Sequence, residues 1–190
     1  MALPSSGTIT MGQVKTEFGG PNTLSSYLKD SAYVKSIPPN SNVPTSLPLR
    51  LTDLYGATKL LDTQTVSNVG FAVAFGVTIV GYLPDTLTGS PGPSISDGTS
   101  NAFGGATITA LFWRNFQNTE YTLNLRFGGT VAADSSKYLY PSNGIGNAKQ
   151  FSNDYRTYYS SGNYTEFRWI TASGENPFPV YNGTVAWYFY

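Results

Sequence analysis

The sequence predicts a mainly β protein: a β-sandwich, with a jelly roll as one candidate topology, preceded by a small N-terminal arm of extended chain and short helices. Three observations predict this fold class. Apolar and polar residues alternate in the second part of the chain, turn-forming residues separate the candidate strands, and no useful helical period occurs there. The first 60 or so residues hold only short apolar patches. We therefore expect a docking arm at residues 1–62 and an all-β domain at residues 63–190.

The all-β domain is expected to contain strands that each bury one face. Alternation is clearest at residues 121–127, where Leu123, Leu125 and Phe127 would face the core. Thr122, Asn124 and Arg126 would then face outward. The candidate strands are residues 69–83, 106–115, 121–127, 149–159, 164–171 and 180–190, and residues 84–105 are expected to form a long loop.

The stretch from residue 184 to residue 190 is strongly aromatic. An exposed strand of this kind would be prone to aggregation. We therefore expect it to pair inside the sheet or to be covered by another subunit. Its apolar and aromatic side chains are Val185, Trp187, Tyr188, Phe189 and Tyr190.

The N-terminal arm contains a degenerate repeat, because residues 7–14 and 48–55 share the same spacing of apolar positions. Gly12 and Thr52 stand where the caps of two short helices belong, and Asn22 could cap a third helix over residues 23–35. Between the repeats, residues 37–48 carry four prolines and are expected to be extended.

Each apolar patch of the arm is too small to form a core alone. We therefore expect these side chains to dock on a particle, either inserting into neighbouring subunits or folding over their own oligomer. The expected docking residues are Ile9, Met11, Val14, Leu24, Tyr27, Leu49, Leu51, Leu54 and Tyr55.

Three segments of the arm, SSGTITMGQVKTEFG, TLSSYLKDSAYV and VPTSLPLRLTDLYGATK, resemble in order a pattern recurrent in virion structural and tail-fibre proteins of tailed bacteriophages. The resemblance covers roughly residues 4–59. It departs from the pattern at Leu47-Pro48-Leu49 and at Leu28-Lys29-Asp30. It implies a location in the virion after assembly in the bacterial host cytoplasm. The implied partners are tail, neck or capsid subunits, together with a homo-oligomer, for which fibre proteins suggest a trimer.

Composition narrows the function. Eleven basic and eleven acidic side chains cancel, so nucleic acid and anionic membranes are not expected partners. The uncharged stretch at residues 69–83 is shorter than the roughly 20 residues of a membrane-spanning helix. The chain has no Cys and no His, which excludes disulfides, the commonest zinc, haem and iron–sulfur sites, and Ser-His-Asp or Cys-His catalysis. We expect no cofactor, no metal and no enzymatic activity. Glycoside hydrolysis by two converging carboxylates stays open as a disfavoured alternative.

Residues 153–164 are rich in Tyr, Ser, Gly and Asn, a composition typical of adaptable recognition surfaces. The functional interpretation is stacking on a host-surface glycan through Tyr155, Arg156, Tyr158, Tyr159 and Tyr164. The structural interpretation, which we favour, is a hairpin with Tyr155 and Tyr159 on one face and Arg156 and Tyr158 on the other.

The sequence therefore predicts a non-enzymatic structural protein of a bacteriophage particle, associated with the tail or fibre. Its N-terminal segment would anchor it, and its β-sandwich would project for host recognition. Two alternatives remain open. One is a capsid decoration protein that staples neighbouring capsomers, and the other is a glycan-binding module.

Overall fold

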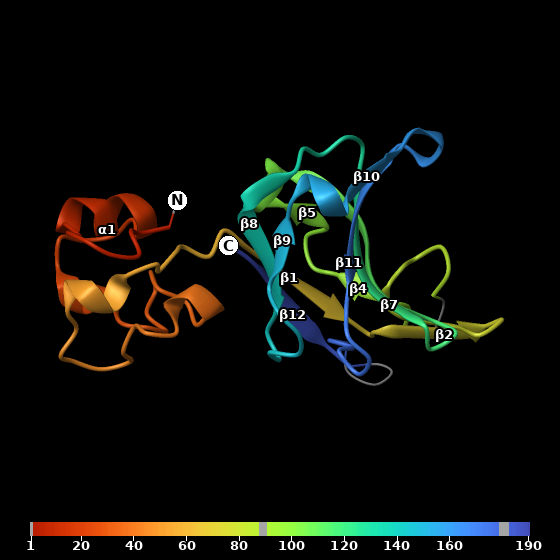
Figure 1. Cartoon of the computed structure of the whole chain (residues 1–190), viewed down its shortest axis with the longest axis horizontal. Coiled ribbons are helices and arrows are strands. Elements are labelled where there is room, and N and C mark those ends of the chain that lie inside the picture. The colour runs from red at the N-terminus through yellow and green to blue at the C-terminus, as the bar shows by residue number, and fades with distance from the viewer. Residues whose placement is uncertain (1, 88–90, 179–182) are drawn as a thin grey trace. The chain divides into compact units, whose positions relative to one another are not determined.

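The computed structural model describes residues 2–87, 91–178 and 183–190. The chain divides between Leu61 and Asp62 into two compact units, and Tyr190 is grouped with the first (Figure 1). Among the described residues, none of the helices has the length and apolar character needed to cross a membrane.

The N-terminal unit holds one α-helix, α1 (Met11–Phe18). Thr10 caps it: Thr10 Oγ1 accepts a hydrogen bond from the Gln13 backbone N–H at 3.3 Å, and Gln13 Oε1 accepts one from the Thr10 N–H at 2.8 Å. This capping box explains why the helix begins before Gly12, which has no side-chain oxygen to offer. The expectation that Gly12 is the cap was therefore wrong.

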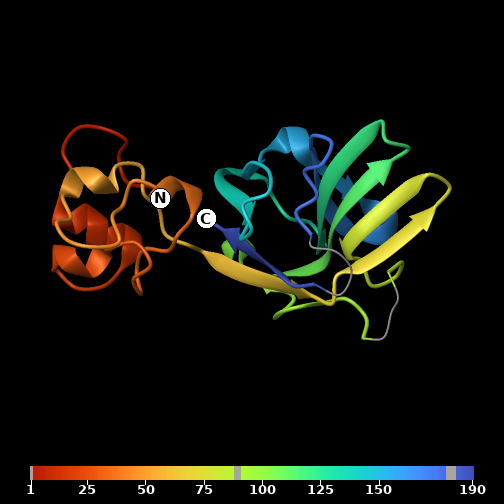
Figure 2. The same ribbon diagram turned by 90° about the horizontal axis from the view of Figure 1, so that it is seen from below.

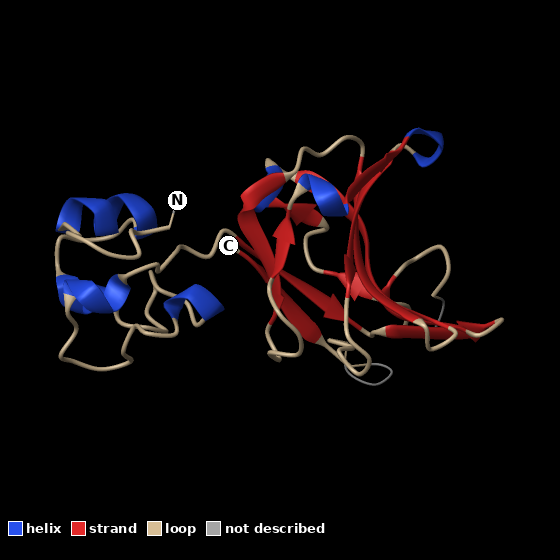
Figure 3. Ribbon diagram, in the orientation of Figure 1, coloured by secondary structure: helices blue, strands red, loops and turns tan. Residues whose placement is uncertain are grey.

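Three short 3-10 turns complete the unit (Figure 3): η1 (Leu24–Tyr27), η2 (Pro38–Asn40) and η3 (Leu51–Leu54). A helix was expected over residues 23–35, but only η1 forms there, so this prediction was wrong for the residues after Tyr27. There the Ser31 hydroxyl accepts hydrogen bonds from two backbone N–H groups that a helix would use otherwise. The connector expected to be extended holds η2. The second repeat forms the 3-10 turn η3, which begins at Leu51 after Arg50, so the expectation that Thr52 is a cap was wrong.

These turns enclose a core of their own. Tyr27 is fully buried in it, and its hydroxyl lies 2.7 Å from the carbonyl oxygens of both Gly19 and Pro21. The patches that look too small in the sequence therefore combine into one cluster. Its buried members are Leu3, Ile9, Val14, Phe18, Tyr27, Val34, Val43, Leu49, Leu54 and Ala57.

The second unit is a β-sandwich of two antiparallel sheets (Figure 2), which confirms the predicted fold class. The five-stranded sheet contains β1 (Asp62–Ser67), β4 (Ser94–Ile95), β8 (Asp134–Pro141), β9 (Lys149–Phe151) and β12 (Val185–Phe189). The seven-stranded sheet contains β2 (Gly70–Ala74), β3 (Val77–Tyr82), β5 (Thr99–Ser100), β6 (Ala106–Phe116), β7 (Glu120–Gly128), β10 (Arg156–Tyr159) and β11 (Tyr164–Ile170). Further 3-10 turns are η4 (Asn101–Phe103), η5 (Asn153–Tyr155) and η6 (Ser160–Gly162).

The strand order is β4-β1-β12-β8-β9 in one sheet and β10-β11-β7-β6-β3-β2 in the other, with β5 pairing β6. The hairpins β2–β3 and β6–β7 lie side by side in one antiparallel sheet through the pairing of β3 with β6, and β4 of the other sheet lies between β3 and β6 in the sequence. This is not the strand order of a jelly roll, in which two Greek keys carry successive strands between sheets.

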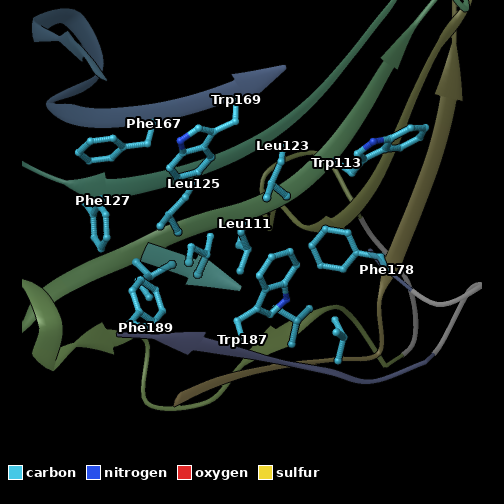
Figure 4. Packing of buried hydrophobic residues seen from close by; sticks show 14 of the residues in the cluster. Leu111, Trp113, Leu123, Leu125, Phe127, Phe167, Trp169, Phe178, Trp187 and Phe189 are labelled. Carbon is cyan, nitrogen blue, oxygen red and sulfur yellow. The ribbon is translucent and has the colours of Figure 1, made fainter. Parts of the chain in front are cut away.

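The core lies between the sheets (Figure 4). β12 runs between β1 and β8, so the aromatic C-terminal segment pairs inside a sheet. Every second side chain of β12 points into the core, namely those of Val185, Trp187 and Phe189. Trp187 is completely buried. Tyr188 faces the other way and is partly exposed.

Two expected strands are divided in the structure. Residues 69–83 form the hairpin β2–β3, which turns at Phe75 and Gly76 with positive φ angles of 51° and 77°, as a two-residue hairpin turn requires. Residues 149–159 are split between β9 in one sheet and β10 in the other, with η5 between them. Of the stretch expected at 180–190, residues 180–182 lie outside the described residues. The loop expected at residues 84–105 holds β4, β5 and η4 in its described part.

Candidate functional site

The outer face of the seven-stranded sheet, the face turned away from the core, carries a patch of polar and charged side chains. Cross-strand register builds it: Arg126 on β7 stands opposite Glu166 on β11, and Asn124 stands opposite Arg168 and Phe112. Because residues opposite each other in antiparallel strands share a face, these side chains lie together although they are far apart in sequence.

A shallow groove of about 300 Å³ follows this patch. Buried Phe112 and Asn124 lie on its floor. The half-exposed Arg114 and Arg126 and the exposed Arg168 stand around them. The lining residues are Val77, Ile79, Leu83, Thr86, Phe112, Arg114, Asn124, Arg126, Glu166 and Arg168. We refer to these residues as the outer-face groove.

Arg126 is the most constrained cation of the outer-face groove. Its Nε donates to Glu166 Oε2 at 2.5 Å, and its guanidinium lies 5.1 Å from the ring centre of Phe112 and 4.9 Å from that of Tyr164. Two aromatic rings and one carboxylate thus fix its plane. Arg168 forms an ion pair with Glu120.

Arg114 differs from these two arginines. Its guanidinium lies 5.2 Å from the ring centre of Phe116. Among the ion pairs between residues that the structure describes, none involves Arg114. Its charge therefore stands at the groove without a carboxylate partner from the described chain.

Asn124 supplies an amide to the floor of the outer-face groove, and the residue is only 3% exposed. Its Nδ2 donates to the Thr122 hydroxyl at 3.0 Å. No hydrogen bond within the described parts of the chain uses its Oδ1. This oxygen is not among the buried side-chain atoms of the described residues that lack a partner, so it keeps contact with solvent and is open to accept a hydrogen bond from a ligand.

The tyrosine-rich segment forms the hairpin β10–β11, as the structural interpretation predicted. Tyr159 stacks on Tyr164 with 4.8 Å between ring centres, and the Tyr158 hydroxyl donates to Asn163 Oδ1 at 3.0 Å. Tyr155 precedes β10 in η5, so it does not share a strand face with Tyr159 as expected. Arg156 Nε donates to a backbone carbonyl at 2.6 Å, which occupies part of its guanidinium.

This hairpin adjoins the outer-face groove, because Tyr164 stacks on Tyr159 on one side and lies over Arg126 on the other. Sequence alternation placed Asn124 and Arg126 on the outward face. It could not reveal that Arg114 and Glu166 join them, because that depends on which strands pair and in which register.

A second and larger hollow, of about 850 Å³, lies beside the β7–β8 connection. Glycine-rich backbone at residues 102–106 and 128–133 lines much of it, together with Asp134 and Lys137. Hydrogen bonds from the Ser136 side chain and from Lys137 lower the pKa of Asp134 to about 2. Lys137 Nζ lies 3.0 Å from Asp134 Oδ2 and 4.8 Å from the ring centre of Phe103. Both charged groups of this hollow therefore have partners.

The structure corrects the expected docking residues of the N-terminal unit. Ile9, Val14, Tyr27, Leu49 and Leu54 are buried in the unit's own core, so their side chains cannot also insert into a neighbouring subunit. The expected residues that remain partly exposed are Met11, Leu24, Leu51 and Tyr55. A groove of about 510 Å³ on this unit runs along residues 2–4 and α1.

Within the described residues, no three Asp or Glu side chains gather in a way that could hold a metal ion. Comparisons with protein-family models, with characterised proteins and with solved structures found no match.

Proposed function

We propose that this chain is a non-enzymatic structural protein of a bacteriophage tail or fibre, attached through its N-terminal unit and carrying the β-sandwich outward for host recognition. One observation carries the proposal. The segment that resembles phage virion proteins spans roughly residues 4–59, and the compact N-terminal unit ends at Leu61. A sequence pattern that coincides with one folded unit is what a portable attachment module requires.

Because most of the expected docking residues are buried in the N-terminal unit's own core, attachment would work differently. A preformed unit with its own core docks as a folded body, so contacts would come from its surface and not from inserted apolar arms. The groove along α1 is apolar at Leu3 and Pro4 and polar at Thr10 and Gln13, as contact surfaces between folded proteins commonly are.

Contacts between copies of the chain belong to the same proposal. β2 is an edge strand with neither charge nor proline, and edge strands normally carry such residues to prevent pairing with other chains. Phe71 and Val73 are 49% and 60% exposed, and Phe75 at the tip of the hairpin is 97% exposed. An unprotected apolar edge suits a homo-oligomer, and the mass of the purified protein by light scattering tests this.

Electron cryo-microscopy of the intact particle tests the main proposal. Density for the chain on the tail, with residues 2–61 against another virion protein, is the expected result. Regular density over the head would replace the tail assignment by the capsid decoration alternative. A purified particle without the chain would overturn the virion assignment altogether.

A further inference from the structure

We infer that the outer-face groove binds an acidic saccharide, whose carboxylate is taken by Arg114. The inference rests on the proposed recognition role of the β-sandwich and names a ligand class and a site for it. Three independent features of the groove carry it: its polar atoms, its charge and its aromatic extension.

The polar atoms of the groove suit sugar hydroxyls, which both donate and accept hydrogen bonds. Asn124 Oδ1 accepts no hydrogen bond from the described chain, and the Glu166 carboxylate and the Arg126 guanidinium stand side by side. A guanidinium has five N–H donors, and only one from Arg126, its Nε–H, is engaged by Glu166 in this pair. The groove thus presents acceptors and donors at fixed positions. Fixed partners reduce the entropy lost on binding.

The net charge of the groove favours an acidic ligand. Its lining holds three arginines and one glutamate, and the ion pair of Arg168 brings in one further glutamate, Glu120. One positive charge remains, and it belongs to Arg114. The planar guanidinium fork matches a carboxylate in bidentate geometry, and the ring of Phe116 holds Arg114 near its position before a ligand arrives.

The aromatic extension suits a chain of sugar rings. From Phe112 the surface continues over Arg126 to Tyr164 and the stacked Tyr159. Tyrosine rings offer apolar area at low entropic cost for the C–H faces of sugars. A volume of about 300 Å³ accommodates a short segment of a saccharide, and a longer chain would run onto the tyrosine hairpin. Nucleic acid fits poorly, because the chain carries no excess of basic residues.

The test uses the full-length protein, labelled with ¹⁵N, and two probes of identical backbone: trigalacturonate and its neutral methyl ester. We expect saturable shifts of the Asn124 side-chain amide and the Arg114 Nε–H resonance with trigalacturonate, weakening as salt is raised. The methyl ester should bind more weakly. Arg114→Ala should lower the affinity for trigalacturonate by about tenfold, the expected order for a lost charge-assisted hydrogen bond.

Matched variants distinguish the contribution of the bidentate guanidinium geometry from that of the positive charge alone. Arg114→Lys keeps the charge without the fork and should fall between wild type and Arg114→Ala. Arg50→Ala removes the same charge from the N-terminal unit and should bind like wild type. Absence of saturable shifts, equal binding of acid and ester, or equal affinity of wild type and Arg114→Ala would each overturn the inference. Because the assay uses the isolated chain, its failure is distinct from failure of the tail assignment, which is read on particles.

Discussion

Arg126 and Glu166 face each other on neighbouring strands, with 2.5 Å between Arg126 Nε and Glu166 Oε2. The Glu166 side chain is only 8% exposed, whereas the exposed pair Arg168–Glu120 is more than 40% exposed on both sides. The two pairs lie on the same sheet face and thus provide a matched comparison of a covered and an open ion pair.

Glu166→Gln should lower the free energy of unfolding by about 1–2 kcal/mol, because the partly exposed Arg126 guanidinium loses the charge of its buried acceptor. Glu120→Gln should cost less than about 0.5 kcal/mol, since open pairs contribute little. Urea denaturation of both variants measures the difference. Equal losses would contradict the assigned role of burial.

Asn40 is expected to hold the N-terminal unit together. Its fully buried amide donates to the Lys35 and Thr58 carbonyls at 2.9 and 3.0 Å, and its Oδ1 accepts from the Thr58 N–H at 2.9 Å. Asn40→Ala should destabilise the unit by about 2–4 kcal/mol, because three backbone groups lose their partner. Hydrogen exchange of the α1 amides reports on this unit specifically. Asn42→Ala, an exposed neighbour, should change exchange little.

Phe75→Asn should stabilise the protein by about 0.5–1 kcal/mol. Phe75 adopts a positive φ of 51° while almost fully exposed, and Asn-Gly is the preferred pair for this hairpin turn. The melting temperature should rise accordingly. Gly76→Ala should act in the opposite direction, because its φ is 77° and an added Cβ would lie 3.0 Å from Gln117 Cγ. A destabilised Phe75→Asn variant would show that Phe75 makes a contact that offsets its backbone strain.

Acid should remove a stabilising contribution of Asp134. Its pKa is lowered to about 2 in the folded protein from an ordinary value of 3.8. A lowered folded-state pKa stabilises the protein above the ordinary value, and this contribution disappears as the pH falls from about 4 to about 2. The difference in unfolding free energy between wild type and Asp134→Asn should therefore narrow over that range. A constant difference would contradict the shifted pKa.

Removal of residues 185–190 should abolish folding of the sandwich, because β12 pairs with strands on both of its sides. Trp187→Ala should cost about 3–5 kcal/mol through the cavity it leaves. Trp187→Phe should cost less, since the buried Nε1 has no hydrogen-bond partner among the described residues. Circular dichroism and urea titration distinguish these outcomes. A soluble, folded truncation would refute the central position of β12.

The strands could be predicted from the sequence where the two-residue alternation of polar and apolar residues is regular. Polar and apolar residue types alternate along β7, so the face of each side chain could be assigned from the order of its amino acids alone. The burial of Thr122 and Asn124 on the outward face could not. β1 and β8 escaped prediction for a physical reason. Gln64 occupies an inward position of β1, where its Nε2 donates to the Thr99 carbonyl at 2.6 Å, and this buried amide masks the alternation. β8 begins with polar residues that are half-exposed or exposed.

The site was less accessible to prediction than the fold. The outward direction of Arg126 followed from alternation, but its partner Glu166 comes from a strand 40 residues away. The N-terminal unit illustrates the same limit, because patches too small to fold separately form one core when loops bring them together. Pairings across long stretches of chain leave no local signal.

The pairing of Asp62 with Phe189 at one end of the β1–β12 ladder has a consequence for biosynthesis. At about 5–20 residues per second, the ribosome makes β12 roughly 6–25 s after β1. The N-terminal unit, whose contacts span far shorter stretches, can fold during that interval while the β1 edge waits unpaired. Slowing translation would therefore lengthen the exposure of nascent β1, and chaperone binding should fall sharply once the 185–189 segment has left the ribosome and can pair with β1.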